Sequence, residues 1–461
     1  MNKETDAPKG SIGTRIIFIF FGIASLLGWN ALITEIPFFL HFVPGIKPDV
    51  SMSFLNYTPN IIFQFILLWK KDLIPLKIQL IVGIVGSIAF LIIIPLFTML
   101  LGIDTIINRA LTCLFVILLG FINALCSGGF FSLITHFPLE MIVSLSSGQG
   151  FSGITLNILQ FIVLASIKGE DEKAIVKRAW VFFSVSAFIL AVCLVLLLIS
   201  FNRDYFQYYL NKTDKKPEPP GENIINAKSE ENLRNDQSGI NLDKEQNQNN
   251  LSKFDKSTQI ISVQQNEKNI EKSNENIQKP NEKTQLTFCE LFHRLWDLDL
   301  IILLVYGVTF TLFPYATINQ KVFSLNYNYS SNTIITIYNA FDTIGRYIVE
   351  LFTPTKRINM INAFSRCILI FFIIFNFYAQ DGLGWNIKLT SCLIILFTLL
   401  LGLTNGIGVT LCFGLAPNEI PEPQFKGQAG SSISFFLIIG IFVGSCVAFG
   451  TEAIIGTFRK T

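Results

Sequence analysis

Long apolar runs separated by short polar connections dominate this sequence. A helix that spans a bilayer needs about 20 apolar residues, and by that measure about eleven segments qualify. They predict an all-α, polytopic membrane protein. The predicted spans are roughly 15–37, 51–69, 76–101, 109–134, 143–167, 179–201, 298–319, 332–353, 361–379, 388–415 and 431–455. The first run is too long for the core of a signal peptide, so it is counted as a helix.

A polar stretch interrupts this pattern after the sixth span. Residues 203–290 are rich in Asn, Gln, Lys, Glu and Ser, with almost no aromatic residues after Tyr209. Apolar content this low cannot offset the entropy lost on ordering a chain, so a disordered loop is expected. The loop is either a regulatory segment or a solvated linker. It divides the protein into an N-terminal six-helix bundle (1–202) and a C-terminal five-helix bundle (291–461).

Composition and motifs exclude most other classes. The chain is 51% hydrophobic and only 15% charged, which excludes an ordinary soluble domain. It contains no Walker motif, dinucleotide fingerprint, nucleophile elbow or HExxH, so we expect neither an enzyme nor a cofactor. The eight cysteines lie mostly in apolar runs, and the three histidines lack metal-ligand spacing. No metal site or disulfide framework is therefore predicted.

The distribution of Lys and Arg predicts the orientation in the membrane. Basic residues gather before the first span, between the second and third, and in the central loop; the acidic and basic segment 168–178 is the exception. The N-terminus and central loop are expected to be cytoplasmic, and an odd number of spans places the C-terminus outside. We expect a plasma-membrane location. Asn328-Tyr329-Ser330 would then face outward, as a glycosylation site or an unused chance sequon.

The most informative polar residues inside a predicted span are Asp342 and Arg346. Four residues apart on a helix, they lie on one face, and Asn339 lies one turn before Asp342. A charge at the bilayer centre costs about 2.5–3.5 kcal/mol, so such groups face a cavity or a partner. The pair is either a substrate site or a structural pair that holds two helices together.

Polar side chains also mark the first span. Leu26, Trp29, Asn30 and Ile33 recur at helical spacing and form one stripe. A Trp at membrane depth offers a flat face for stacking a planar ring, and an Asn offers a donor and an acceptor for its edge. Helix packing with an interhelical hydrogen bond is the alternative.

Four later spans carry further candidates. Gln149 lies between two glycines, which explain close helix packing but not the glutamine itself. Pro314 frees a backbone carbonyl and is a candidate kink or gate. Asn405 lies between Thr404 and Gly406, on a helix surface whose small residues favour close helix packing. Arg366, near the start of its span, is expected to extend to the inner membrane interface.

These motifs, in this order, resemble the equilibrative nucleoside transporter family over nearly all of the membrane part. The most specific match is the run of Asn339, Phe341, Asp342, Gly345 and Arg346, which is similar to the eighth-helix signature of the family. Gly28 stands where that family usually has a proline. The other matching stretches are 26–30, 147–150, 201–209, 404–406, 429–430 and 435–436.

The resemblance implies eleven helices, arranged six plus five and related to the major facilitator architecture. It implies a central cavity that opens alternately to each side, with Trp29, Gln149, Asp342 and Arg346 near the nucleoside. The sequence thus predicts a facilitative transporter of nucleosides or nucleobases, such as adenosine, inosine or hypoxanthine, that serves purine salvage and binds no nucleic acid. The expected substrate-binding residues are Leu26, Trp29, Ile33, Gln149, Asn339, Asp342 and Arg346, and the expected structural or gating residues are Asn30, Pro314 and Asn405.

Two other functions stay open. Asp342 is an ionisable group at membrane depth, as a proton-coupled symporter needs, although Arg346 one turn away favours a permanent ion pair. A ligand-sensing or channel-like membrane protein could use the same cavity. The spans lack the repeated charged or small ring of a pore, which argues against a channel.

Overall fold

The computed structural model describes residues 10–70, 73–169, 171–214, 286–313, 315–318, 320–352, 355–420 and 422–460. Most of the segment predicted to be disordered, 203–290, lies outside the described residues, and so does Pro314. Within the described residues, the secondary structure is helical. This agrees with the all-α fold that the apolar runs predict.

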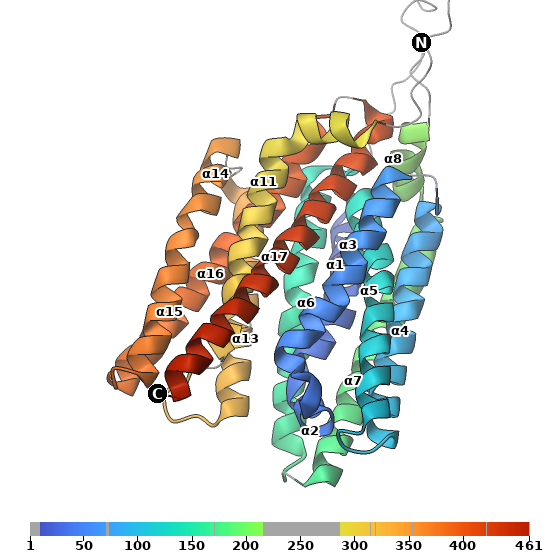
Figure 1. Cartoon of the computed structure of the whole chain (residues 1–461). Coiled ribbons are helices and arrows are strands. Elements are labelled where there is room, and N and C mark those ends of the chain that lie inside the picture. The colour runs from blue at the N-terminus through green and yellow to red at the C-terminus, as the bar shows by residue number, and fades with distance from the viewer. Residues whose placement is uncertain are drawn as a thin grey trace, which may run out of the picture. The chain divides into compact units, whose positions relative to one another are not determined.

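The helices form two groups in chain order, which Figure 1 shows side by side in blue to green and in yellow to red. The first group contains α1 (Ile12–Thr34), α2 (Ile36–Phe42), α3 (Pro48–Trp69), α4 (Leu76–Leu100), α5 (Ile106–Ile134), α6 (Leu139–Ser166), α7 (Glu172–Ser200) and α8 (Asp204–Asp214). The second contains α11 (Phe288–Leu312), α12 (Tyr315–Ile318), α13 (Tyr327–Phe352), α14 (Lys356–Ser365), α15 (Cys367–Asp381), α16 (Ile387–Leu415) and α17 (Lys426–Lys460). Both groups belong to one compact unit.

Nine helical segments in the described part of the chain are long and apolar enough to cross a membrane. They are α1, α4, α5, α6, α7, α11, α14 with α15, α16 and most of α17. The helices α3 and α13 are long but carry more polar residues, and both pack against membrane-spanning helices of the other group. Counting them as spans reproduces the predicted eleven, which remains a prediction.

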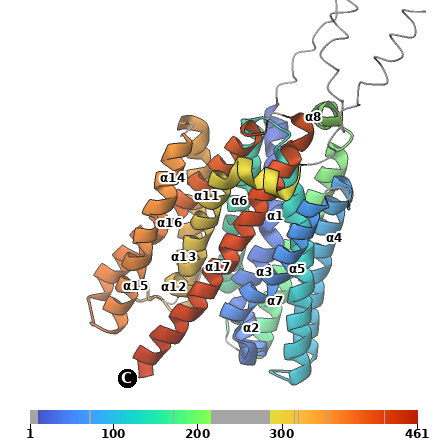
Figure 2. The same cartoon turned by 45° about the horizontal axis from the view of Figure 1, so that its top comes forward.

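The two ends of the bundle are named here after the helices that lie there. The α8 end holds α8 and the start of α11, and the α2 end holds α2 and the end of α17 (Figure 2). Helix α1 runs from the α8 end to the α2 end, whereas α13 runs in the opposite direction. The middle of α1 and the middle of α13 therefore lie at a similar depth.

The predicted start of the disordered segment is wrong, because helix α8 occupies its first residues. The range 203–290 begins with helical residues, and Phe206 of α8 is buried with its ring 5.2 Å from that of Phe18. Burial of aromatic rings offsets the entropy cost of ordering this helix. The N-terminal group thus extends beyond residue 202, to 214.

Helix α11 corrects the predicted end of the same segment and the start of the seventh span. It begins at Phe288 rather than near residue 298, because Thr287 and Glu290 form a capping box. In addition, Gln428 of α17 accepts a hydrogen bond from the backbone of Leu286 at 3.1 Å. The cap fixes the helix start in a stretch too polar to be recognised by hydropathy.

Glycines allow the closest helix contacts near the centre of the bundle. At the crossing of α1 and α6, a Cβ added to Gly148 would lie 2.0 Å from a backbone carbonyl oxygen of α1. At the crossing of α13 and α16, a Cβ added to Gly406 would lie 2.0 Å from the carbonyl oxygen of Asp342. Only glycine lets two backbones approach so closely. The neighbouring residues, Gln149 and Asn405, are thereby held against the next helix.

Candidate functional site

A cavity of about 90 Å³, the central cavity, lies between the two groups of helices. Its lining comes from α1, α3, α5 and α6 of the first group and from α11, α13, α16 and α17 of the second. The structure places nine of the ten site residues expected from the sequence in this wall, and the tenth, Pro314, lies outside the described residues. The nine are Leu26, Trp29, Asn30, Ile33, Gln149, Asn339, Asp342, Arg346 and Asn405.

The ion pair expected from the sequence forms in the wall of this cavity. The Nε of Arg346 lies 2.8 Å from Oδ2 of Asp342, and both residues are buried. The Nη1 of Arg346 also donates to Oε1 of Gln149 at 3.0 Å, and the amide of Gln149 donates to the hydroxyl of Ser25 at 3.1 Å. One chain of hydrogen bonds therefore joins α13 of the second group to α6 and α1 of the first.

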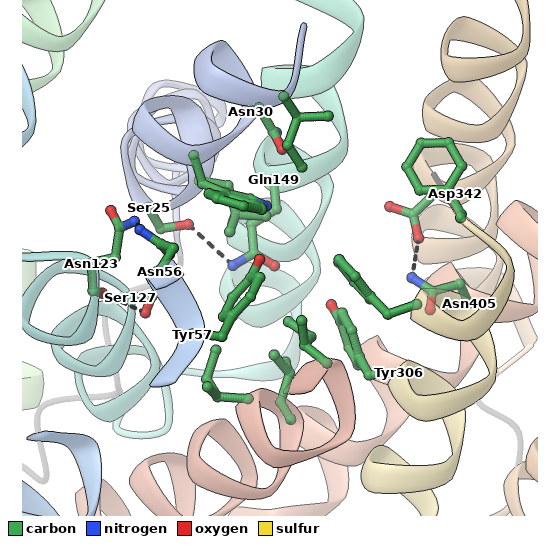
Figure 3. Close-up of a pocket in the computed structure, with 18 of the residues that line it drawn as sticks. Ser25, Asn30, Asn56, Tyr57, Asn123, Ser127, Gln149, Tyr306, Asp342 and Asn405 are labelled. Atoms are coloured by element: carbon green, nitrogen blue, oxygen red, sulfur yellow. Dashed lines mark hydrogen bonds between the residues drawn. The ribbon is translucent and has the colours of Figure 1, made fainter. Parts of the chain in front are cut away.

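The second carboxylate oxygen of Asp342 is bound within the second group of helices. Asn405 of α16 donates to Oδ1 of Asp342 at 2.7 Å, as Figure 3 shows. The hydroxyl of Thr309 on α11 lies 2.9 Å from Oδ1 of Asn405. Asp342 thus has partners on both oxygens, which lowers the cost of burying its charge.

The expectation that the side chain of Arg366 extends to the membrane interface is wrong. Arg366 is buried at the junction of α14 and α15, where it donates to the carbonyl oxygen of Leu401 at 3.0 Å. It also donates to the hydroxyls of Thr309 and Thr404. The break between the two helices turns Arg366 toward α11 and α16, whose carbonyls and hydroxyls solvate its charge. Through Thr309 and Asn405 it is linked to Asp342.

Sequence reasoning missed the aromatic and amide side chains that complete the wall. Asn56, Tyr57 and Asn60 of α3 line the cavity, and so do Tyr306 and Phe310 of α11. Tyr57 and Tyr306 lie between the polar residues of the first group and those of the second (Figure 3). One signal was present in the sequence, since Asn56 and Asn60 are four residues apart in an apolar run and so share a helix face. The rings offer flat surfaces to a planar ligand.

Two contacts join the two groups of helices between the central cavity and the α8 end. Phe131, in the cavity wall, stacks on Phe413 of α16 with ring centroids 4.0 Å apart. Nearer the α8 end, Nη2 of Arg15 on α1 lies 2.5 Å from Oε2 of Glu350 on α13. Each contact joins the first group of helices to the second.

Toward the α2 end, the central cavity adjoins a second cavity of about 350 Å³, which we name the vestibule. Its wall is made by α1, α2, α6 and α7 of the first group and by α13 of the second. Ile33 lies in the walls of both cavities. The central cavity therefore borders the vestibule on the side that faces the α2 end.

Comparison with protein families identifies what this arrangement resembles. Residues 113–453 match the family model described as nucleoside transporter. Equilibrative nucleotide transporter 7 of Arabidopsis thaliana is 23% identical over 458 residues, which cover 97% of this chain and 97% of the relative. Equilibrative nucleoside transporter 2 of Rattus norvegicus is 23% identical and covers 98% of this chain and 99% of the relative.

Comparison with solved structures identifies the fold. The proton:xylose symporter of the major facilitator superfamily superposes with a TM-score of 0.59 at 12% sequence identity, over 96% of this chain and 89% of that chain. The E. coli fucose:proton symporter gives a TM-score of 0.55 at 11% identity, over 98% of this chain and 94% of that chain. The fold is therefore of the major facilitator type.

Proposed function

Because the chain belongs to the nucleoside transporter family, we propose that its central cavity binds a nucleoside or nucleobase and carries it across the membrane. The protein is a multi-pass membrane transporter rather than an enzyme. Transport is facilitative and proceeds by alternating access between the two groups of helices. The observation that carries the proposal is the buried pair of Asp342 and Arg346 in the wall of a cavity between those groups.

The proposal gives a role to eight residues of the cavity wall. Asp342 and Arg346 bind the ribose hydroxyls or the polar edge of the base, and Gln149 bonds the base. Trp29 and Tyr57, whose ring centroids are 4.9 Å apart, stack against the base, and the side chains of Leu26 and Ile33 extend the apolar wall. Asn30 holds α1 against α6 through a 3.0 Å hydrogen bond from its amide to Ser152.

Substrate binding must rearrange this cavity. Pockets that hold small organic ligands usually measure about 300–1,000 Å³, and the central cavity is smaller. The bond between Arg346 and Gln149 joins the two groups of helices across it. In the proposed mechanism the substrate replaces this bond, the cavity widens, and the two groups then rock about the bound molecule.

The proposed orientation follows the basic residues of the sequence. The α8 end is cytoplasmic and the α2 end faces outside, at the plasma membrane. The vestibule then opens outward, and the stack of Phe131 on Phe413 is the inner gate. The ion pair of Arg15 and Glu350 supports that gate at its cytoplasmic side.

Reversing one charge of the Arg15–Glu350 pair is expected to weaken the inner gate. Arg15→Glu places two like charges together, and half-exposed pairs of this kind contribute about 0.2–1 kcal/mol. The inner gate then stays open for longer, and uptake falls about two- to fivefold. The swap Arg15→Glu with Glu350→Arg should restore uptake, measured at matched surface expression. A swap that transports no better than the single variant would contradict the assignment.

Uptake of radiolabelled adenosine, inosine and hypoxanthine into cells that lack their own carriers tests the function. A facilitative carrier gives saturable uptake, counterflow of preloaded substrate, and no accumulation above the outside concentration. Accumulation that an uncoupler abolishes would identify a proton-coupled symporter instead. Currents without saturation would identify a channel-like protein, and no flux of any of the three substrates would refute the proposal.

A further inference from the structure

The vestibule has a polar wall whose hydrogen-bonding capacity is not used. Glu35 lies between α1 and α2, Gln160 in α6 and Asn332 in α13, and these residues are only 3%, 7% and 5% exposed. Among the residues that the structure describes, no donor lies within hydrogen-bond distance of Oε1 of Glu35, Oε1 of Gln160 or Oδ1 of Asn332. Buried acceptors without a donor are unfavourable. A ligand that carries N–H or O–H groups would supply the missing donors.

The charges of the vestibule oppose a cationic ligand. Arg178 of α7 lines the same cavity as Glu35, so the wall contains both an acid and a permanent cation. The positive charge of Arg178 opposes binding of a metal cation to the three oxygens. Arg178 can also donate to carbonyl or ring-nitrogen acceptors of a ligand. Phe38 and Ile335 add apolar surface against which a flat ring can pack.

From this wall we propose that the vestibule is a second binding site for a nucleoside or nucleobase, occupied before the molecule passes Ile33 into the central cavity. The proposal rests on the proposed transport function. Gln160 and Asn332 accept hydrogen bonds from amino or hydroxyl groups of the ligand, and Arg178 donates to its acceptors. The wall includes α13 of the second group as well as helices of the first, so the site exists only while the α2 end is open.

Glu35 gives this site a dependence on pH. Burial raises the pKa of Glu35 to about 8, and the Gln160 amide and the Arg178 charge oppose that rise only in part. The other titratable group in the wall is His41 of α2, while α6 and α13 contribute residues that do not titrate. Below about pH 8 the neutral acid both donates and accepts a hydrogen bond. Above it, a ligand would cover a buried carboxylate, so vestibule binding weakens.

Binding of radiolabelled adenosine to the purified full-length protein, with the central site disabled, isolates the vestibule. The background variant is Asp342→Asn with Arg346→Gln. It should keep one weak, saturable site for adenosine, and adding Gln160→Leu should weaken that site about tenfold, the effect of losing a hydrogen bond in a desolvated site. Adding Glu35→Gln should keep binding near neutral pH but remove its decline above pH 8. Lys177→Gln, an exposed neighbour of Arg178 outside the vestibule wall, is the matched control and should change neither property.

The same variants in the otherwise native protein give a second readout. Gln160→Leu removes an acceptor that has no donor and also the amide that bonds Glu35, so uptake is compared at matched surface expression. At matched expression the KM for adenosine uptake should rise with little change in Vmax. Absence of weak binding in the background variant, or binding that Gln160→Leu leaves unchanged, would overturn the vestibule site while transport itself stands. Sodium-dependent uptake that Gln160→Leu makes independent of sodium would identify a cation site and would overturn it too. A native protein that transports none of adenosine, inosine and hypoxanthine would refute the proposed function as well.

Discussion

Asp342→Asn is expected to reduce nucleoside uptake at least about a hundredfold. The asparagine keeps the shape of the side chain but leaves the charge of Arg346 buried without its counterion. Removing one partner of a buried ion pair costs about 3–5 kcal/mol, and each 1.4 kcal/mol is a factor of about ten. The hydrogen bond from Asn405, now 2.7 Å from Oδ1, also loses its charged acceptor. Radiolabelled adenosine uptake, normalised to the amount of protein at the cell surface, measures the effect.

A double variant separates a binding defect from a folding defect. Asp342→Asn with Arg346→Gln removes both charges, so no uncompensated charge stays buried. Surface expression should recover toward that of the native protein, whereas uptake should remain lost because the groups that bind the substrate are gone. Normal uptake by Asp342→Asn at normal surface expression would contradict the proposed site.

Gly406→Ala is expected to destabilise the protein more than a glycine-to-alanine substitution at a helix position where an added Cβ makes only ordinary contacts. The added methyl group would lie 2.0 Å from the carbonyl oxygen of Asp342, so α13 and α16 must separate. Overpacking of this kind costs about 1–3 kcal/mol, and here the clash is with backbone, which cannot rotate away. Thermal unfolding of the detergent-solubilised protein should begin several degrees lower. Adenosine uptake should fall as well, because Asn405 moves away from Asp342.

Gly307→Ala is the matched control for that substitution. Gly307 also lies in a transmembrane helix, but a Cβ added there would meet its nearest neighbour, the carbonyl oxygen of Gly440, at 3.8 Å, an ordinary contact. Its unfolding temperature should be no lower than that of the native protein, because alanine has the higher helix propensity. Equal losses of stability at Gly307 and Gly406 would mean that close backbone approach does not explain the effect at Gly406.

The ion pair is the part of the site that local geometry makes predictable. The four-residue spacing of Asp342 and Arg346 places them on one helix face whatever the fold, and their charge excludes lipid as a partner. The glycines around Gln149 and after Asn405 likewise indicate helix contacts, and the structure places both residues beside the cavity. Apolar length was sufficient to identify nine helices among the described residues that can span a membrane.

Partners that are distant in the sequence were not predictable. The bond of Arg346 to Gln149 joins residues 197 positions apart, and nothing in either segment specifies the other. Tyr306 lies in a helix that is apolar around most of its circumference, so hydropathy does not indicate which side faces the cavity. Arg366 was misplaced for a related reason, since its burial depends on the break between α14 and α15 and on acceptors from α11 and α16.

The amino-acid sequence by itself determined the class of protein, most of the helices, and the charged pair at mid-membrane, because these depend on hydrophobic length and on spacing within one helix. Only the tertiary structure decided which face of each helix lines the cavity, and that Glu35, Gln160 and Asn332 meet in a vestibule. The physical reason is that the rotation of a largely apolar helix about its axis is set by packing against its neighbours, through contacts such as those at Gly148 and Gly406.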